Sequence, residues 1–542
     1  MALRSLFIAL AWVAGPTLPA TATPPNIVFI VADNQPASAL GAYGNRDVES
    51  PHIDALAHRG VRFDRAYAAS GMCSPTRATL LTGLMPSQHG LHNALSDPWV
   101  ESREPGWNAV GEYRTVPATL AHRGYRTAMV GKWHLGDPTR PSLGFEHWVA
   151  LPYGHTIDFW NNELVANGRR ENVSGRHIVD ELAERAVDYI ESADRARPFF
   201  LQVNLDGPYA LPPSNYGPAR NRHYEAVASR TFESMPQLPV DDRILARLDG
   251  PFIEGQKLFE LRSLSAVWDH LLYGTIRMQN DRESYANFVS QNQVVDDAVG
   301  RIVEAIAARG LAQRTVIVYT ADQGNLYGQH GTWGHTIWLT PAHLYEHALR
   351  VPLIVVHPEG RSGGVSERLI GQYDIAPTLL ALAEVEGVSF DGSPGRSFTD
   401  EIMGGANGAA AAQEVYFEQG ESRGVRTERW AYWQRLKGFG ECALFDMAAD
   451  PEQEHNLCAN GRILPEQREA KNRLDALLVS FFSRHSTPEH DLWASGVSKG
   501  MPAKPDMWLR HRPWDWAKKF WRDYVSDPEP APRFEEVDQA ER

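Results

Sequence analysis

The chain has 542 residues, of which 43% are hydrophobic and 22% are charged. This composition excludes collagen-like, disordered and coiled-coil proteins, and the length predicts one large domain with a smaller one, because single cores rarely exceed roughly 250–300 residues. Asp and Glu number 67 against 53 Lys and Arg, so the net charge is −14. A negative field opposes binding to a polyanion, so nucleic acid is not an expected partner.

Residues 1–22 have the pattern of a secretory signal peptide. Arg4 precedes an apolar run over residues 6–14, and small residues at 20–22 form a cleavage site. The run is too short to cross a bilayer, and no later stretch approaches the ~18 apolar residues that a membrane helix needs. We therefore expect an exported protein, periplasmic or secreted, with no membrane span.

Apolar runs of strand length recur through residues 23–413, the expected large domain. They occupy residues 26–32, 127–131, 199–205, 315–320 and 351–356. Helical patterns separate them, and the longest, over residues 285–309, is followed by Gly310, a residue that suits the end of a helix. Strands that are apolar throughout and alternate with helices are typical of an α/β fold. The expected architecture is a large, mainly parallel sheet sandwiched by helices.

The sequence changes in character at residue 414. Short aromatic runs at residues 415–417, 430–433 and 443–445 are followed by an amphipathic pattern over residues 468–482. This order predicts a small antiparallel sheet with a packed helix, as an α+β subdomain over residues 414–492. Residues 493–542 are rich in Trp, Pro and charge, and we expect them to form an extension that wraps the surface.

Three cysteines are few for an exported protein, and the odd number leaves one without a partner. Cys442 and Cys458 lie close in the sequence and could form a disulfide. Cys73 is then either a small buried hydrophobic residue or a residue that carries chemistry, and the composition does not choose between them.

Polar residues follow four of the predicted strands. In open α/β sheets, ligands bind beyond the carboxyl ends of the strands. Each of these residues alone could be a turn former or a helix cap, but together they predict a site at one edge of the sheet. They are Asp33 and Asn34, the run from Lys132 to His134, the run from Asp206 to Pro208, and Asp322 with Gln323.

The segment from Cys73 to Gly83 reads CSPTRATLLTG. It resembles the Cys-x-Pro-x-Arg signature of the type I, formylglycine-dependent sulfatases, of the alkaline-phosphatase-like superfamily. Further blocks resemble the same family in the same order: residues 25–34, residues 131–136 (GKWHLG), and residues 320–324 with 328–331. The likeness covers roughly residues 24–480 and leaves the C-terminal extension and an insertion over residues 215–284 unexplained.

The resemblance implies a sulfuric ester hydrolase in which Cys73 is oxidised to formylglycine. The oxidation requires a formylglycine-generating or sulfatase-maturating enzyme as a partner. The family binds one calcium ion, and oxygen ligands such as those found here select calcium or magnesium over zinc. The implied metal site consists of Asp33, Asn34, Asp322, Gln323 and the modified Cys73.

The resemblance also implies roles for the charged residues of the site. Arg77 would hold the formylglycine, and Lys132 would hold the sulfate. Asp322 would accept the proton of the attacking hydroxyl, and His134 would take the proton of the second hydroxyl of the formylglycine hydrate. A core histidine bonded to the backbone is the alternative for His134.

The sequence departs from the family at the metal and at the leaving group. Asn34 stands where the family has a second Asp, which removes one negative charge, and Gln323 stands where Asn or His is common. Tyr209 replaces the usual catalytic His, and the Lys expected before residues 345–346 is missing, with His335 the nearest replacement. His335 could be the general acid and Tyr209 a hydrogen-bond donor, and a surface role is open for both. His155 resembles a family position near the sulfate, and its role is equally open.

The leading hypothesis is an exported sulfatase that hydrolyses a carbohydrate sulfate. The favoured substrate is a sulfated glycan oligomer, because Trp160 and the insertion over residues 215–284 are expected to form an aromatic rim that suits sugar rings. One alternative is a phosphoester or phosphonate hydrolase of the same superfamily. Another is a catalytically silent carbohydrate-binding homologue in which Cys73 stays unmodified.

Overall fold

The computed structural model describes residues 24–95, 100–154, 156, 158–209, 219–236, 278, 281–331, 333–336, 342–405, 413–437, 440–459 and 463–499. Several segments discussed above lie outside the described residues: the expected signal peptide, His155, most of the insertion over residues 215–284, and the C-terminal extension from residue 500. Within these ranges, no helix has both the length and the apolar character needed to cross a membrane.

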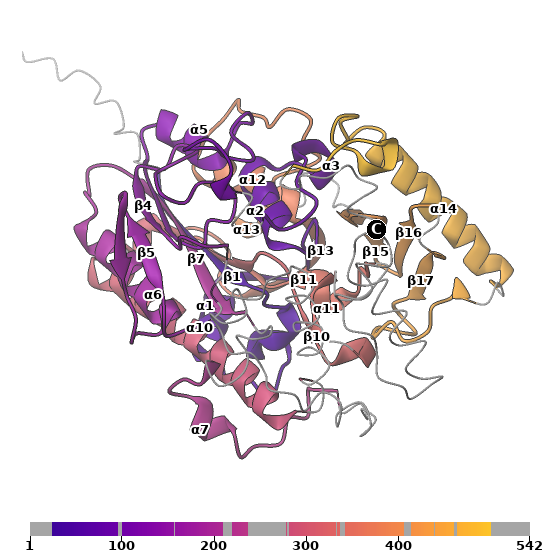
Figure 1. The fold of residues 1–542 in the computed structure, drawn as a ribbon, viewed down its shortest axis with the longest axis horizontal. Helices are drawn as coiled ribbons and strands as arrows, with labels where there is room; N and C mark the ends of the chain where they lie inside the picture. The colour runs from indigo at the N-terminus through magenta and orange to yellow at the C-terminus, as the bar shows by residue number, and fades with distance from the viewer. Residues whose placement is uncertain are drawn as a thin grey trace, which may run out of the picture.

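Among the described residues, a sheet of eleven strands forms the centre of the molecule (Figure 1). The strand order is β11-β2-β12-β8-β1-β7-β3-β4-β5-β6, and β13 pairs with β2. The strands are β1 (Asn26–Asp33), β2 (Val61–Tyr67), β3 (Arg126–Gly131), β4 (His147–Ala150), β5 (Glu163–Ala166), β6 (Arg169–Asn172), β7 (Phe199–Pro208), β8 (Thr315–Ala321), β11 (Arg350–Val351), β12 (Leu353–Val356) and β13 (Gly364–Gly371).

The middle of the sheet is parallel, as the sequence predicts. Strand β1 pairs in parallel with β8 and β7, and β7 pairs in parallel with β3. Strands β1, β7 and β8 are buried along their whole length, which explains why their sequences are mainly apolar.

The outer strands differ from this pattern. The strand predicted over residues 351–356 is divided at Pro352 into β11 and β12, because proline lacks the N–H that a strand ladder uses. Strand β12 runs antiparallel to both β8 and β2, and β4, β5 and β6 pair antiparallel in sequence. The sheet is therefore mixed.

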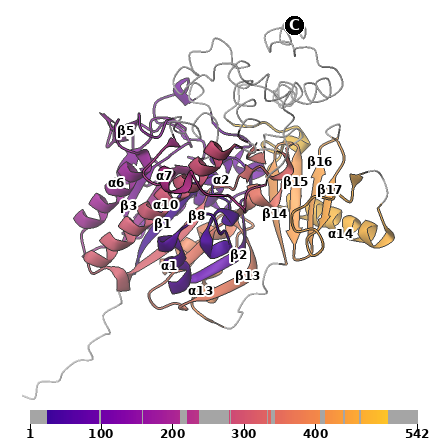
Figure 2. The ribbon, with the colours of Figure 1, turned by 90° about the horizontal axis from the view of Figure 1, so that it is seen from below.

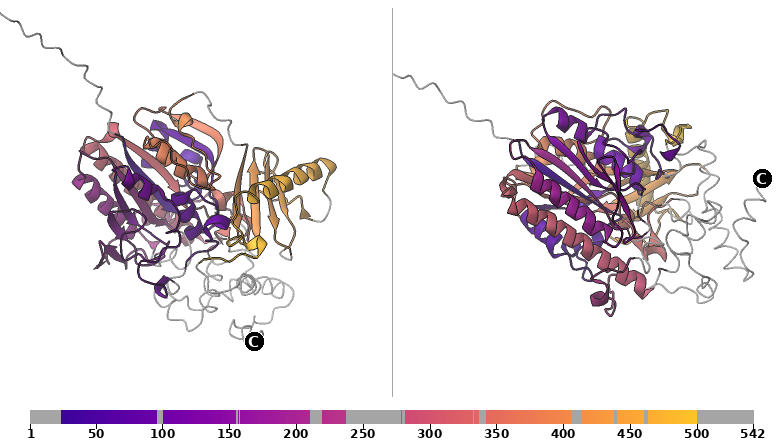
Figure 3. Two further views of the ribbon diagram at one scale, coloured as in Figure 1. Left: turned by 90° about the horizontal axis from the view of Figure 1, so that it is seen from above. Right: turned by 60° about the vertical axis from the view of Figure 1, so that its left-hand side comes forward.

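Helices cover both faces of the sheet (Figure 3). Helices α6 (Ile178–Ser192) and α10 (Arg282–Ala308) pack together and against β7, and α10 is followed by Gly310 in the left-handed region, as predicted. Helices α2 (Cys73–Thr82), α5 (Val116–His122) and α12 (Ile375–Leu382) pack on one another over the opposite face. Among the described residues, the other α-helices of this part are α1 (Pro51–Arg59), α3 (Pro86–His89), α7 (Tyr224–Val227), α11 (Glu346–Leu349) and α13 (Thr399–Ile402).

A second sheet follows in the C-terminal part, beside the first (Figure 2). Its four strands are antiparallel in chain order: β14 (Glu414–Gln419), β15 (Ser422–Thr427), β16 (Trp430–Arg435) and β17 (Ala443–Asp446). Helix α14 (Pro465–Phe482) packs on β15 and β16. A disulfide joins Cys442 and Cys458, which confirms that pairing and leaves Cys73 free and buried.

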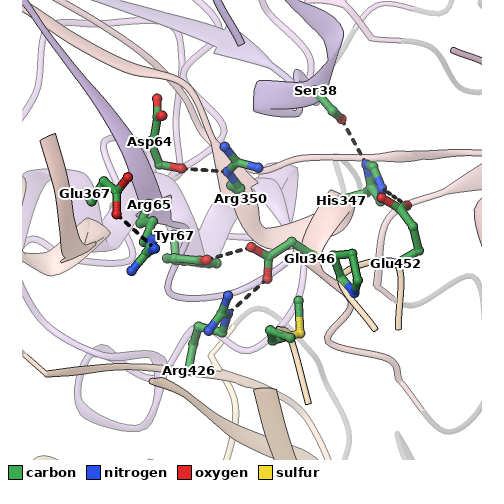
Figure 4. A pocket seen from close by; sticks show the side chains of 12 residues that line it. Ser38, Asp64, Arg65, Tyr67, Glu346, His347, Arg350, Glu367, Arg426 and Glu452 are labelled. Atoms are coloured by element: carbon green, nitrogen blue, oxygen red, sulfur yellow. Dashed lines mark hydrogen bonds and ion pairs between the residues drawn. The ribbon is translucent and has the colours of Figure 1, made fainter. Parts of the chain in front are cut away.

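Paired charges line a hollow of about 290 Å³ between the two sheets (Figure 4). Glu346 accepts hydrogen bonds from Tyr67 Oη at 2.6 Å and from Arg426 Nε at 3.3 Å. Tyr67 ends β2 of the large sheet and Arg426 lies on β15 of the small one, so Glu346 links the two sheets. Nearer the surface, Arg65 pairs with Glu367 at 3.1 Å.

Candidate active site

The polar residues that follow the parallel strands meet at one edge of the sheet. Strands β8, β1, β7 and β3 are neighbours in the sheet, and each ends within two residues of a charged side chain: Asp322, Asp33, Asp206 and Lys132, respectively. Three residues that are not glycine have positive φ just beyond these ends: Asn34 (56°), His134 (57°) and Tyr209 (29°). Backbone held in this region costs free energy and is concentrated at functional sites.

Two cations and two carboxylates form the centre of the site. Lys132 Nζ lies 2.5 Å from Asp33 Oδ2, and Arg77 Nη2 lies 3.3 Å from the same oxygen and 2.8 Å from Asp322 Oδ2. All four side chains are buried. Burial raises the pKa of the Asp33 carboxyl, and the charges of Lys132 and Arg77 oppose that rise. Burial lowers the pKa of Lys132, but Asp33 and the other acidic groups nearby together outweigh burial and raise the pKa, so the ammonium stays charged.

Cys73 is the first residue of α2 and points into this cluster. Burial raises the pKa of its thiol to about 12, although Lys132 opposes the shift. The beginning of a helix normally lowers a thiol pKa, and here burial is the stronger effect. The unmodified thiol is therefore protonated at neutral pH and is a poor nucleophile.

Oxygen atoms suited to a hard cation surround Cys73. Asp33, Cys73 and Asp322 offer ligand atoms that all lie within 4.8 Å of one another. Gln323 Nε2 donates to Asn34 Oδ1, and to Cys73 Sγ at 3.1 Å, so both amide side chains reach the same point. Asp33 Oδ1 is buried and has no hydrogen-bond partner among the described residues. A buried anionic oxygen without a donor fits a divalent cation, and turning the Gln323 amide would present Oε1 to it.

His134 is hydrogen-bonded to Ser74, the second residue of α2. Its backbone oxygen accepts a hydrogen bond from Ser74 Oγ at 2.8 Å, and its ring Nε2 lies 2.8 Å from Leu95 O. Ser74 Oγ also accepts from Leu95 N at 3.0 Å. The residue next to Cys73 thus fixes the loop that carries His134.

A family model described as "Sulfatase" matches residues 25–385 of the chain. The chain belongs to the sulfatase family. A second model, described as "N-sulphoglucosamine sulphohydrolase, C-terminal", matches residues 334–480. The family and the α/β architecture expected from the sequence are confirmed, and the protein is a sulfuric ester hydrolase.

Curated relatives and solved structures resemble this sulfatase over most of its length. The N-acetylglucosamine-6-O-sulfatase of Bacteroides thetaiotaomicron is 26% identical over 507 residues, which cover 83% of this chain and 86% of that protein. Arylsulfatase A of Homo sapiens is 29% identical over 508 residues, covering 88% and 90%. A structure solved in complex with its substrate D-glucosamine-2-N,6-O-disulfate has a TM-score of 0.64 at 22% identity, covering 85% of this chain and 98% of that one.

Tyr209 lies within the site of this sulfatase. It is buried, and Lys132 Nζ lies 5.0 Å from the centre of its ring. Burial raises the pKa of the Tyr209 hydroxyl well above its usual value, and the negative groups nearby add to the effect. The hydroxyl therefore stays protonated at neutral pH.

His335 is buried close to the segment that leads into Cys73. The next residue, Thr336, donates from Oγ1 to Gly71 O at 3.2 Å, two residues before Cys73. His155 lies outside the described residues, so its place is not assigned. Trp160 lines a hollow of about 630 Å³ with residues of α6 and α10, among them Asp180 and Arg301.

Asp206 was not assigned a role from the sequence, although it follows a predicted strand. Its side chain is fully buried, and Oδ2 accepts a hydrogen bond from Thr156 N at 2.8 Å. Burial raises the pKa of this carboxyl, with Lys132 opposing the shift. Asp206 therefore anchors the loop between β4 and β5 to the end of β7, beside the charged cluster. Its position at a strand end was the only signal available in the sequence.

Proposed function

We propose that this sulfatase is exported and hydrolyses sulfate esters of carbohydrates, with formylglycine at position 73 and one calcium ion. The observation that carries the proposal is the position of Cys73, which lies beside Lys132, Arg77 and two carboxylates in a site from which water is largely excluded. The thiol itself is protonated there and is a poor nucleophile, so a modified residue supports catalysis better than the thiol does.

The residues present fit both groups. Asp33, Asn34, Asp322 and Gln323 would hold calcium, which would polarise the sulfate and lower the pKa of the attacking hydroxyl. The hydrate of formylglycine would supply two hydroxyls, one to attack sulfur and one to restore the aldehyde. Because Asn34 contributes no charge, we expect weaker calcium binding than a site with two adjacent Asp residues would give.

The chain's own side chains would position the sulfate and move protons. Lys132 would neutralise a sulfuryl oxygen, and Arg77 would hold the residue at position 73 in place. Asp322 would accept the first proton and His134 the second. His335 is the proposed general acid for the leaving alcohol, because the raised pKa of Tyr209 makes that residue a poor proton donor.

The remaining proposals concern organisation and substrate. We assign a signal peptide to residues 1–22, the catalytic domain to 23–413, the C-terminal subdomain to 414–492 and an extension to 493–542. Export and the maturating enzyme as a partner follow from the signal peptide and from the sequence around Cys73. A carbohydrate substrate is supported by the name of the Bacteroides relative, whereas the human relative is named for aryl sulfates.

The test compares kcat/KM for a sulfated sugar, for the same sugar as a phosphate monoester, and for 4-nitrophenyl sulfate. The proposal expects the sulfated sugar to have the highest value. A higher value for the phosphate ester would favour the phosphoester hydrolase instead. If no ester is turned over and the Cys73 thiol is intact, the protein is a silent binding homologue.

A further inference from the structure

A third hollow lies directly beside His134. Its volume is about 370 Å³, within the range of roughly 300–1,000 Å³ that is typical of small-molecule sites. It lies between the loops that follow β3 and β4, the segment over residues 100–105, and β6. The lining side chains that matter here are His134, Asp137, Arg140, Tyr153 and Arg170.

The wall of this hollow is in contact with the catalytic machinery. Gly154 packs against the His134 ring so closely that a Cβ atom at position 154 would lie 2.5 Å from His134 Nε2. His134, which is proposed to take a proton during the reaction, therefore forms one side of the hollow. Ser74, the residue after Cys73, donates a hydrogen bond to the backbone oxygen of His134 at 2.8 Å, so the hollow lies next to the segment that carries the reacting residue.

The charges around the hollow balance. Arg103, Arg140 and Arg170 face three acidic residues, Glu101, Glu104 and Asp137, so the formal sum is zero. A pocket for a second sulfate or a uronate would need an excess of positive charge, because a buried anion must be paired. The balance therefore disfavours a further anionic group and favours an uncharged one.

The polar groups of the hollow suit sugar hydroxyls. Asp137 is held by hydrogen bonds from Gly106 N at 2.7 Å and from Thr139 N at 2.8 Å, and it lies 3.4 Å from Arg140 Nε. Fixed donors and acceptors side by side can bind a hydroxyl, which both donates and accepts. Tyr153 adds an aromatic ring that is 43% exposed, against which the apolar face of a sugar can pack.

We propose that this hollow binds the sugar ring next to the sulfated residue, and that this neighbouring ring is uncharged. The inference rests on the proposed function, since it assigns part of the carbohydrate to one place. The protein would then hydrolyse sulfated oligosaccharides in which the sugar next to the sulfated sugar carries hydroxyls and no sulfate. An aryl sulfate would leave these donors and acceptors unused.

The test uses the mature, metal-loaded enzyme and three substrates that share one sulfated sugar: the monosaccharide, a disaccharide with a neutral neighbour, and a disaccharide with a sulfated neighbour. The measured quantity is the ratio of kcat/KM for each disaccharide to kcat/KM for the monosaccharide. For the neutral disaccharide the ratio is expected to be about tenfold or more, since about 1.4 kcal/mol of added binding corresponds to tenfold. For the sulfated neighbour it is expected to be near or below one.

Two variants and a matched control locate the effect. Tyr153→Ala and Arg170→Gln should reduce the ratio for the neutral disaccharide toward one. Arg170 is 54% exposed and pairs with Glu163 at 3.1 Å; the control Arg126→Gln changes an arginine that is 44% exposed and pairs with Glu146 at 2.7 Å, at the opposite end of β3. The control should keep the wild-type ratio, and thermal unfolding checks that all variants fold.

The possible results separate this inference from the proposed function. If the monosaccharide is hydrolysed but the neutral disaccharide gains nothing, or if the sulfated neighbour is preferred, the assignment of the hollow is wrong while the function stands. If both variants keep the wild-type ratio, a different surface binds the neighbour. If no sulfated saccharide is hydrolysed, the proposed function fails and this inference fails with it.

Discussion

Lys132 Nζ and Asp33 Oδ2 lie 2.5 Å apart, and both side chains are fully buried. Each charge compensates the other, because an unpaired buried ion costs on the order of several kcal/mol. Asp33 is also a proposed ligand of calcium, so one carboxylate is shared between the lysine that would bind sulfate and the ion that would polarise it. The two carboxylate oxygens of Asp33, at the end of β1, therefore lie at the centre of the site.

The missing carboxylate at position 34 leads to a prediction about calcium. Chelation should inactivate the enzyme, and added calcium should restore its activity. Asn34→Asp should lower the calcium concentration that is needed for half-maximal activity by about tenfold, because a charged ligand increases the affinity for calcium. Asp322→Asn should shift the requirement in the opposite direction and abolish turnover. Calcium titration followed by thermal unfolding gives a measurement that does not depend on activity. Equal calcium dependence in all three proteins would contradict the ligand assignment.

The raised pKa of Cys73 predicts slow alkylation of the unconverted chain. A thiol with a pKa of about 12 is protonated throughout the ordinary range, and only the thiolate reacts. The rate with iodoacetamide should therefore rise about tenfold per pH unit from pH 8 to 10, whereas a free thiol levels off above its pKa of about 8.5. The same chain in urea is the control, and Cys73 is the only free thiol. A plateau near pH 8.5 in the folded chain would show that burial does not hold the proton.

The roles of His335 and Tyr209 can be separated by the leaving group. A sugar alkoxide needs a proton to leave, and 4-nitrophenolate does not. His335→Gln should lower kcat for a sulfated sugar by about 10²-fold or more and affect 4-nitrophenyl sulfate little, because general acids contribute about 10²–10⁴. Tyr209→Phe should lower both rates by a similar, smaller factor. A selective loss with the sugar in Tyr209→Phe, and none in His335→Gln, would assign the acid to Tyr209.

Glu346 is predicted to stabilise the contact between the two sheets. Glu346→Gln weakens its interactions with Tyr67 and Arg426 and should lower the free energy of unfolding by about 1.5–3 kcal/mol, as for hydrogen bonds to charged groups. Glu367→Gln, in the same hollow, changes a side chain that is 72% exposed, and should cost at most about 0.5 kcal/mol. Urea unfolding measures both, and equal losses would show that Glu346 does not carry the contact.

The parts of the fold that could be predicted depend on local sequence. Strands β1, β3, β7 and β8 are largely apolar because both faces of the sheet are covered, so their positions and the polar residues near their ends could be read directly from the sequence. Strand β15 was not predicted, because its sequence SRGVRT is polar. It is buried because Arg423 pairs with Glu418 at 3.1 Å and with Asp491 at 2.7 Å, a partner far away in the sequence.

The site was predicted as a set of residues but not as an arrangement. The signature around Cys73 and the strand ends identified Asp33, Arg77, Lys132 and Asp322, which the structure brings together. The shared Asp33 oxygen, the anchoring role of Asp206 and the hollow beside His134 depend on the positions of loops after folding. The position of Trp160 could not be read from the sequence either. Its aromatic side chain suggested a substrate rim, and the structure places it beside α6 and α10.

The state of Cys73 in active enzyme tests the central claim most directly. The peptide that contains residue 73 should be isolated from preparations of different specific activity and its mass measured. We predict that this peptide has lost sulfur in proportion to activity, and that Cys73→Ala is folded and inactive. Full activity in a preparation whose Cys73 thiol is intact, or in Cys73→Ala, would contradict it.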